Sequence, residues 1–149
     1  MDYVFEIGKR FGNLPFYINE EEIKGYLGAP DFFKKEVGVD CYTSDYKYIE
    51  FGIDISYLHF DEFDDAIQIQ TNKIFLNDND LYVLPKNEVL ELIKNEYASR
   101  KIKFNYEYES YEFEDAENQE EYDFEDIGLT LWFRNQKLIN ASVSKPISE

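Results

Sequence analysis

YKYIEFGIDISYL, residues Tyr46–Leu58, is the stretch that decides the fold. On each side of Gly52, aromatic or aliphatic residues recur at every second position. This period of two is typical of a strand with one buried face, because successive side chains of a strand point to opposite faces of the sheet. The pattern returns at Ile67–Gln70 and at Leu129–Arg134, and Leu138–Val143 follows as a last strand. We therefore predict an antiparallel meander.

Two stretches have the period of a helix instead. Glu20–Leu27 is short, carries its acids in the first turn and ends at Gly28. Asn87–Ser99 follows Pro85 and has one apolar face. No Gly/Ser-rich linker interrupts the 149 residues. The sequence thus predicts one domain, residues 1–149, of the α+β class: mostly antiparallel sheet, with two helices packed on one face.

The remaining stretches are read from turn residues. Gly38 and the TSD run predict a loop over residues 31–45, and AENQEE predicts a loop over residues 116–121. The apolar runs at 74–76 and 81–84 predict two strands joined by the NDND turn at 77–80. Asn and Asp are ordinary turn formers, and NDND lacks the glycine of a calcium loop, so we predict no metal site there.

The acidic charge is concentrated in one segment. Asn105–Asp126 reads NYEYESYEFEDAENQEEYDFED and holds eleven carboxylates without a Lys or Arg, which is −11 of the net charge of −17. It also holds six aromatic residues, whereas acidic disordered segments have few. Such a surface repels nucleic acid and anionic lipid and attracts basic proteins. We therefore predict a basic protein partner, no nucleic acid and no membrane.

The candidate contacts form two acidic groups, one on the turn predicted at Phe60–Asp65 and one on the acidic segment. Pairing of neighbouring sheet edges would bring the two groups together. Aromatic residues occupy even positions before Ser110 and odd positions after it, which predicts a bulge or a strand end there and two outward-facing aromatic anchors. The predicted contacts are Asp61, Glu62, Asp64, Asp65, Glu107, Glu109, Tyr111, Glu112, Phe113, Glu114 and Asp115.

Catalytic motifs are lacking. Cys41 and His59 are the single cysteine and the single histidine, and neither stands in a recognisable motif. We predict no catalytic residue, no cofactor and no metal. A single cysteine, the lack of a signal-peptide core and the lack of an apolar run of about eighteen residues favour the cytoplasm.

Three further motifs support a family resemblance. INEEEIKGYLGAPD at 18–31, Y-x-Y-x-x-x-GIDIS at 46–56 and GLTLWF at 128–133 resemble small acidic bacterial immunity proteins encoded beside polymorphic or contact-dependent toxins. The resemblance implies a non-enzymatic inhibitor that binds one cognate toxin, for which a nuclease is the expected class. Two alternatives remain open: a phage-type nucleic-acid mimic that inhibits a defence nuclease, and a small enzyme that uses carboxylates or the Cys41–His59 pair. The oligomeric state is left open.

Overall fold

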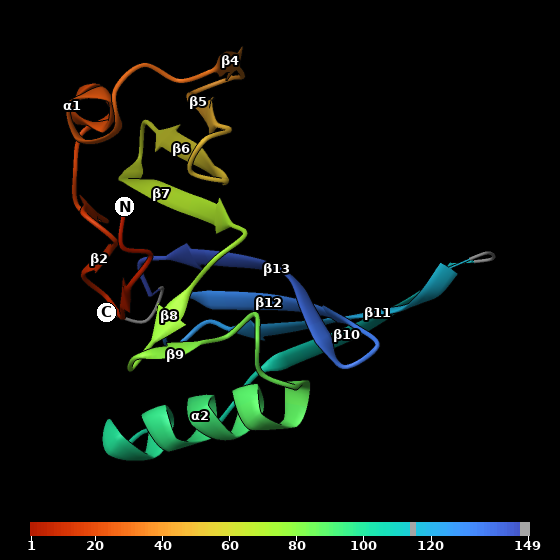
Figure 1. Cartoon of the computed structure of the whole chain (residues 1–149). Helices are drawn as coiled ribbons and strands as arrows, with labels where there is room; N and C mark the ends of the chain where they lie inside the picture. The colour runs from red at the N-terminus through yellow and green to blue at the C-terminus, as the bar shows by residue number, and fades with distance from the viewer. Residues whose placement is uncertain (114–115, 147–149) are drawn as a thin grey trace.

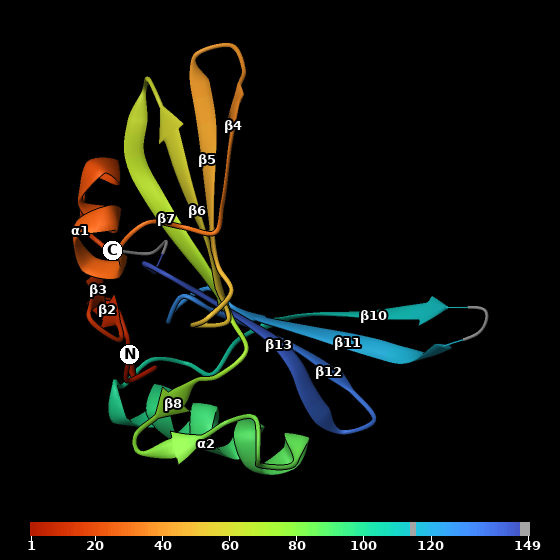
Figure 2. The same cartoon turned by 45° about the horizontal axis from the view of Figure 1, so that its top comes forward.

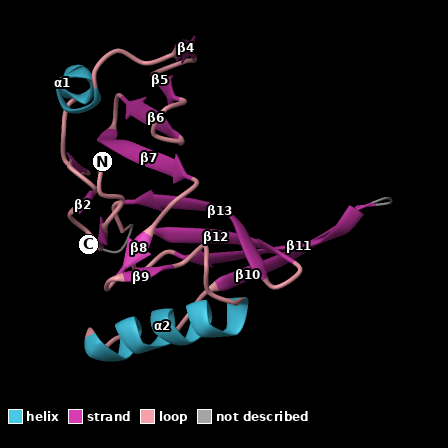
Figure 3. Ribbon diagram, in the orientation of Figure 1, coloured by secondary structure: helices cyan, strands magenta, loops and turns pink. Residues whose placement is uncertain are grey.

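An eight-stranded antiparallel sheet dominates the structure (Figures 1 and 3). The computed structural model describes residues 1–113 and 116–146. In spatial order the strands are β10 (Glu107–Phe113), β11 (Ala116–Phe124), β12 (Leu129–Arg134), β13 (Lys137–Ser144), β7 (Phe63–Thr71), β6 (Ile53–Phe60), β5 (Cys41–Tyr48) and β4 (Phe32–Val37). The predicted antiparallel meander is confirmed, because consecutive strands of the chain pair with one another within each half of the sheet.

Shorter elements complete the fold. They are β1 (Phe5–Glu6), β2 (Arg10–Phe11), β3 (Leu14–Pro15), the 3-10 helix η1 (Glu20–Glu22), α1 (Ile23–Leu27), β8 (Phe75–Leu76), β9 (Asn79–Asp80) and α2 (Lys86–Ser99). Strands β1, β2 and β3 form a small sheet of their own, and β8 pairs with β9. The class is therefore broadly α+β and mostly β.

The large sheet consists of two meanders, β4–β7 and β10–β13. They are joined by a short seam between β13 and β7, in which Ala141 pairs with Thr71 and Ser144 pairs with Gln68 at the two ends. In Figure 2 the two meanders diverge from this seam as separate wings. Among the described strands of this sheet, β13 and β7 are the neighbours that lie far apart in sequence, and their pairing holds the two meanders together.

Strand register sorts the side chains into two rows that cross the sheet. One row, here called the core row, is apolar throughout: Phe33, Tyr46, Ile55, Ile69, Val143, Leu129 and Phe124. All of its members except Phe33 are buried. The adjacent row lies on the opposite face, here called the open face: Phe32, Lys47, Asp54, Gln70, Ser142, Thr130, Asp123 and Glu107. The period of two in the sequence is this separation of faces.

Both predicted helices exist. Residues 20–27 form η1 followed by α1, and α1 ends at Gly28, whose φ of 81° is a left-handed conformation that glycine adopts easily. The second helix, α2, buries Val89, Ile93 and Tyr97, and the Tyr97 ring meets the Phe124 ring of β11 edge-on at 6.4 Å between centroids. Within the described residues, no helix combines the length and the apolar composition needed to span a membrane.

Three local predictions were wrong. The predicted loop at 31–45 contains β4 and the first five residues of β5. Alternation was absent there because β4 is exposed along its whole length. The predicted loop at 116–121 is the first part of β11, whose polar residues pair with β10 and β12 on either side. The predicted strand at 81–84 is a turn: β9 ends at Asp80, and Asn77 and Asp78 make the tight turn with φ of 49° and 65°.

Gly128 and Gly25 provide a test of the seam region. Gly128 has a φ of 71°, and a Cβ there would overlap the carbonyl oxygen of Ser144. We expect Gly128→Ala to lower the free energy of unfolding by at least about 1–2 kcal/mol, the usual backbone penalty of a left-handed residue. Gly25 of α1 has open space around it, and Gly25→Ala is expected to raise stability by up to about 1 kcal/mol. Urea unfolding of both variants checks this, and equal effects would contradict it.

Candidate functional site

The acidic segment forms the β10–β11 hairpin at one edge of the sheet, where it projects beyond the other strands (Figure 1). Register places Glu107, Glu109 and Tyr111 on the open face, together with Glu121 and Asp123 of β11. Tyr108 lies on the other face, with its ring 5.0 Å from that of Tyr122. Alternation along one strand therefore separates the anionic residues from the aromatic packing.

Three carboxylates converge at the base of this hairpin. Oxygen atoms of Glu107, Asp123 and Glu125 lie within 4.8 Å of one another. Repulsion from Glu107 and then from Asp123 raises the pKa of Glu125. Among the ion pairs between described residues, none includes any of these three carboxylates. The carboxylate oxygens of the cluster could coordinate a divalent cation. They could equally form ion pairs with a Lys or Arg side chain of another protein.

On the core-facing side of the same hairpin, the negative charge of Glu120 is neutralised by an ion pair. Glu120 pairs with Lys86 of α2 at 2.7 Å, and both side chains are largely buried. The hydrogen bond from Lys86 lowers the pKa of Glu120, against the effect of burial. The hydroxyl of Tyr108 also donates to Glu120, at 2.8 Å. Sequence analysis missed this pair because no spacing rule links Lys86 to a strand that was read as a loop.

Tyr111 lies on the open face, as predicted for an outward aromatic, with 36% of its surface exposed. Its hydroxyl is 2.9 Å from a Glu109 oxygen and 2.8 Å from a Glu121 oxygen. The hydrogen bond with Glu121, followed by that with Glu109, raises the pKa of Tyr111. The tyrosine therefore stays neutral, and its single hydroxyl proton is shared between carboxylates of two strands.

The bulge or strand end predicted at Ser110 lies slightly later in the chain. Pairing with β11 is regular from Glu107 to Tyr111, and the register shift lies between Tyr111 and Phe113. The parity of the aromatic residues changes because Tyr108 and Tyr111 occupy opposite faces of one continuous strand. Glu112 is exposed. Glu114 and Asp115 lie outside the described residues, as does the side chain of Phe113.

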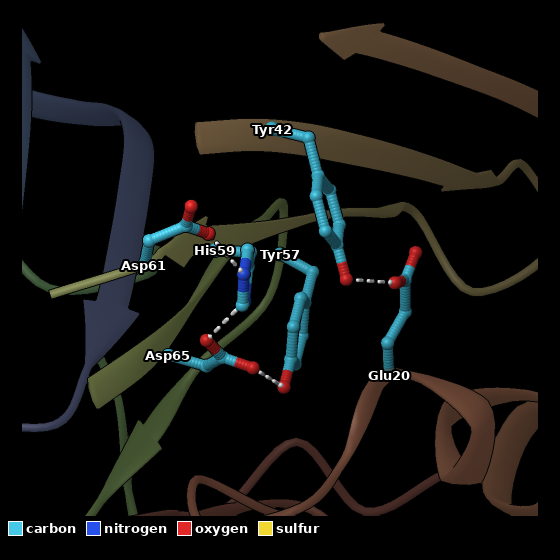
Figure 4. A network of polar contacts seen from close by, with 6 residues as sticks. All are labelled: Glu20, Tyr42, Tyr57, His59, Asp61 and Asp65. Carbon is cyan, nitrogen blue, oxygen red and sulfur yellow. Dashed lines mark hydrogen bonds and ion pairs between the residues drawn. The ribbon is translucent and has the colours of Figure 1, made fainter. Parts of the chain in front are cut away.

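The second predicted acidic group, Asp61, Glu62, Asp64 and Asp65, separates into two residues that contact His59 and two that are exposed. The turn is shorter than expected, since Asp64 and Asp65 belong to β7. Asp61 and Asp65 contact the two ring nitrogens of His59, at 3.1 Å and 2.7 Å (Figure 4). Glu62 and Asp64 are exposed. Of the four predicted acids in this group, Asp61 and Asp65 are therefore engaged by His59, whereas Glu62 and Asp64 do not contact it.

The two acidic groups are not on neighbouring edges, because β12 and β13 lie between the β10–β11 hairpin and β7. They approach each other differently, across a cleft of about 380 Å³ near the end of β13. Asp64 lines this cleft from β7, and Asp123 and Glu125 line it from the other wing. Lys145, whose ammonium lies over the Tyr17 ring, is a basic residue at the same cleft.

His59 is the centre of a polar network on the core-face side of the β4–β7 wing. Asp65 also accepts a hydrogen bond of 2.7 Å from Tyr57, while the Tyr42 ring stacks on His59 at 4.7 Å (Figure 4). The Tyr42 hydroxyl in turn donates to Glu20 at 3.0 Å. Hydrogen bonds from neighbouring hydroxyl groups outweigh burial and lower the pKa of Glu20. The network ties the N-terminal helical turn to three strands, β5, β6 and β7.

The structure does not bring Cys41 and His59 together. Tyr42 pairs with His59, and Cys41, one residue earlier on β5, therefore points to the opposite face of the sheet. With a carboxylate at each ring nitrogen, protonated His59 can donate one proton to each, and neither nitrogen is then free to accept a proton. The two carboxylates favour the protonated form of the ring and raise its pKa.

Comparisons of this chain with models of protein families, with curated proteins and with solved structures find no match.

His59 should make stability depend on pH. The hydrogen bond with Asp65, supported by Asp61, raises the pKa of His59 above its ordinary value of 6.5. A raised pKa means that the stabilisation is complete below about pH 6.5 and is lost as pH rises through the folded-state value. Thermal melts from pH 5.5 to 9 should show this loss in the native chain and a flatter profile in His59→Gln.

Titration of the ring by NMR gives the pKa directly, because His59 is the single histidine. A ring pKa at or below 6.5, or an identical pH profile for His59→Gln, would contradict the arrangement.

Proposed function

We propose that this protein is a non-enzymatic immunity protein that binds and neutralises a basic toxin domain, a nuclease being the class that fits best. The observation that carries the proposal is the convergence of Glu107, Asp123 and Glu125 without a described ion-pair partner. Like charges held this close destabilise the free protein. A basic side chain of a partner would remove that repulsion on binding.

The location of the cluster supports a protein partner. The open face carries mostly polar and charged side chains, with Phe32 and Trp132 among them, and in Figures 1 and 2 no other described helix or strand lies against it. We also propose that both helices cover the core face. Glu20 accepts a hydrogen bond from Tyr46, and Tyr97 contacts Phe124, and both partners belong to the core row. The open face then remains available over its full width.

Aromatic residues supply contact area beside the charges. Tyr111 lies between Glu109 and Glu121, and Trp132 pairs with Glu121 across β11 and β12. Tyrosine and tryptophan are the residues that most often anchor interfaces, while the charges around them govern encounter. A toxin that cleaves nucleic acid must itself be basic where it holds phosphates, and this makes it electrostatically complementary.

The decisive experiment is protection. The reading frame next to this gene would be expressed in a sensitive host with and without the protein. Rescue from that toxin, with no effect on unrelated nucleases, supports immunity. A nucleic-acid mimic would instead inhibit several unrelated nucleases, because it imitates what they all bind. Failure to rescue from the neighbouring toxin, together with no complex between the two purified proteins, would refute the proposal.

Neutralising the cluster should slow association with that toxin. We expect Glu107→Gln/Asp123→Asn/Glu125→Gln to lower the association rate about tenfold at low ionic strength, and to differ little from the native chain at high salt. The free triple variant should melt no lower than the native chain, because repulsion is relieved. Stopped-flow kinetics at several salt concentrations measure the rates.

A matched control removes the same number of charges elsewhere. Glu50, Asp78 and Glu91 are exposed and lie in the β5–β6 turn, the β8–β9 turn and α2. If Glu50→Gln/Asp78→Asn/Glu91→Gln slows association equally, the net charge governs encounter and the cluster has no special part.

Tyr111→Ala should act on dissociation. An aromatic anchor buried by the partner contributes after encounter, so we expect the dissociation rate to rise about tenfold or more with a nearly unchanged association rate. Surface-based kinetics with the immobilised toxin measure both rates. Tyr26→Ala, at an exposed tyrosine of α1, is the control. An unchanged dissociation rate for Tyr111→Ala would place the interface elsewhere.

A further inference from the structure

The edge of the sheet opposite the acidic hairpin exposes several apolar side chains beside its charged ones, and no other described helix or strand covers it. β4 is the last strand of the sheet, and Figure 2 shows no element outside it. Its side chains and those of the following turn are unusually exposed for their type: Phe32 62%, Val37 76% and Val39 89%. Edge strands of this kind are templates for pairing with another strand, unless they are blocked.

Backbone geometry fixes which groups of β4 are available. The amide of Gly38 donates to the carbonyl of Cys41 at 2.9 Å, and the pairing with β5 is regular from Phe32 to Val37. In an antiparallel pair, hydrogen-bonded positions alternate along the strand. Even-numbered residues of β4 therefore bond to β5. The N–H and C=O groups of Phe33, Lys35 and Val37 point away from the sheet.

Side-chain charge then selects a register for symmetric antiparallel pairing of two β4 strands. With Lys35 on the two-fold axis, Lys34 of each copy faces Glu36 of the other, and Phe33 faces Val37. The axis could also fall at Lys34 or at Glu36, and each of these three registers places one like-charged pair on the axis, Lys35, Lys34 or Glu36 with its own equivalent, which destabilises a strand pair. Only the Lys35-centred register also places Lys34 opposite Glu36, and it does so twice. All the outward backbone groups of Phe33, Lys35 and Val37 find partners in the Lys35-centred register.

Two features make this register compatible with the lysines of the strand. Lys34 and Glu36 already contact each other at 2.6 Å within one strand, so both side chains lie on one face and can exchange partners between copies. Lys35 lies on the other face, with its ammonium 4.1 Å from the centre of the Tyr42 ring of β5. That contact draws the positive charge inward, away from its symmetry mate.

We infer that the protein forms a symmetric dimer in which β4 pairs antiparallel with β4 of a second copy, in the register centred on Lys35. The two large sheets become one continuous sheet across the axis. Phe33 of each copy meets Val37 of the other, and the acidic hairpins lie at the two far ends. A two-fold contact of this kind closes on itself, as most homo-oligomers do. The inference does not depend on the proposed function.

Reversing the charge at position 34 or at position 36 tests the proposed register of the two β4 strands. Sedimentation velocity over a range of concentrations should show a monomer–dimer equilibrium for the native chain. Lys34→Glu alone and Glu36→Lys alone each place like charges at both 34–36 contacts of the dimer, and each should raise the dimer Kd about tenfold or more. Mixing the two variants should restore the dimer, because every 34–36 contact is then complementary.

The mixed dimer is decisive because neither variant regains its own Lys34–Glu36 contact. Native mass spectrometry, with one variant isotope-labelled, should find mainly species with one chain of each kind. Lys94→Glu and Glu91→Lys on the exposed side of α2 make the same charge changes and should leave Kd unchanged. Far-UV circular dichroism checks that each variant is folded.

Four outcomes would overturn the inference. A native chain that stays monomeric at about 100 μM would leave the edge for a strand of another protein. Open polymers would indicate pairing of β4 with β10 of the next copy. A dimer unaffected by either single variant, or one that mixing fails to restore, would mean that another surface or another register is used.

Discussion

The pairing of β13 with β7 is the constraint on which the rest of the structure depends. It spans only Thr71–Gln68 against Ala141–Ser144, yet it is where the two meanders of the sheet meet. A side-chain bond of 2.9 Å from Gln68 to Ser142 reinforces it on the open face. Because the seam is short, β7 extends beyond it, and the cleft near the end of β13 places Asp64 opposite Asp123 and Glu125. The two acidic groups thus approach each other because the part of β7 before Gln68 does not pair with β13 and borders the cleft instead.

Neutralisation of charge differs between the two faces of the acidic hairpin. On the core-facing side, Glu120 has Lys86, and the ion pair ties β11 to α2. On the open face, Glu107, Asp123 and Glu125 repel one another. A protein under selection for stability alone would have little reason to keep that repulsion, whereas binding sites often retain such unfavourable arrangements. This contrast within one hairpin supports the proposed binding surface more directly than the net charge does.

Sequence patterns predicted those elements whose faces differ in polarity. Ile53, Ile55 and Tyr57 alternate because one side of β6 is buried, and α2 was found because Val89, Ile93 and Tyr97 recur with a helical period. The β4 and β11 strands were missed for the opposite reason. β4 is exposed on both faces, and the polar residues Gln119, Glu120 and Glu121 of β11 alternate between its two faces, so neither strand shows a period of two in polarity.

The candidate site was predicted in part for a related reason. Composition identified the acidic segment, and parity placed Tyr111 on the outer face. Composition could not reveal that Asp61 and Asp65 are engaged by His59, nor that Glu125 joins Glu107 and Asp123. Those facts depend on register and on contacts between distant segments. Periodicity therefore predicted which faces are buried, and only the tertiary structure determined which acids remain unneutralised.

The position of Trp132 has a practical consequence. It is the single tryptophan of the chain, and it lies on the open face of β12, opposite Glu121 of β11 and Asn140 of β13. Excitation of the indole therefore reports on this face alone, without competing emission from another tryptophan. A molecule that settles on the open face would change the polarity around that ring and shift its emission. The chain thus carries an intrinsic fluorophore on the very surface that is proposed to bind.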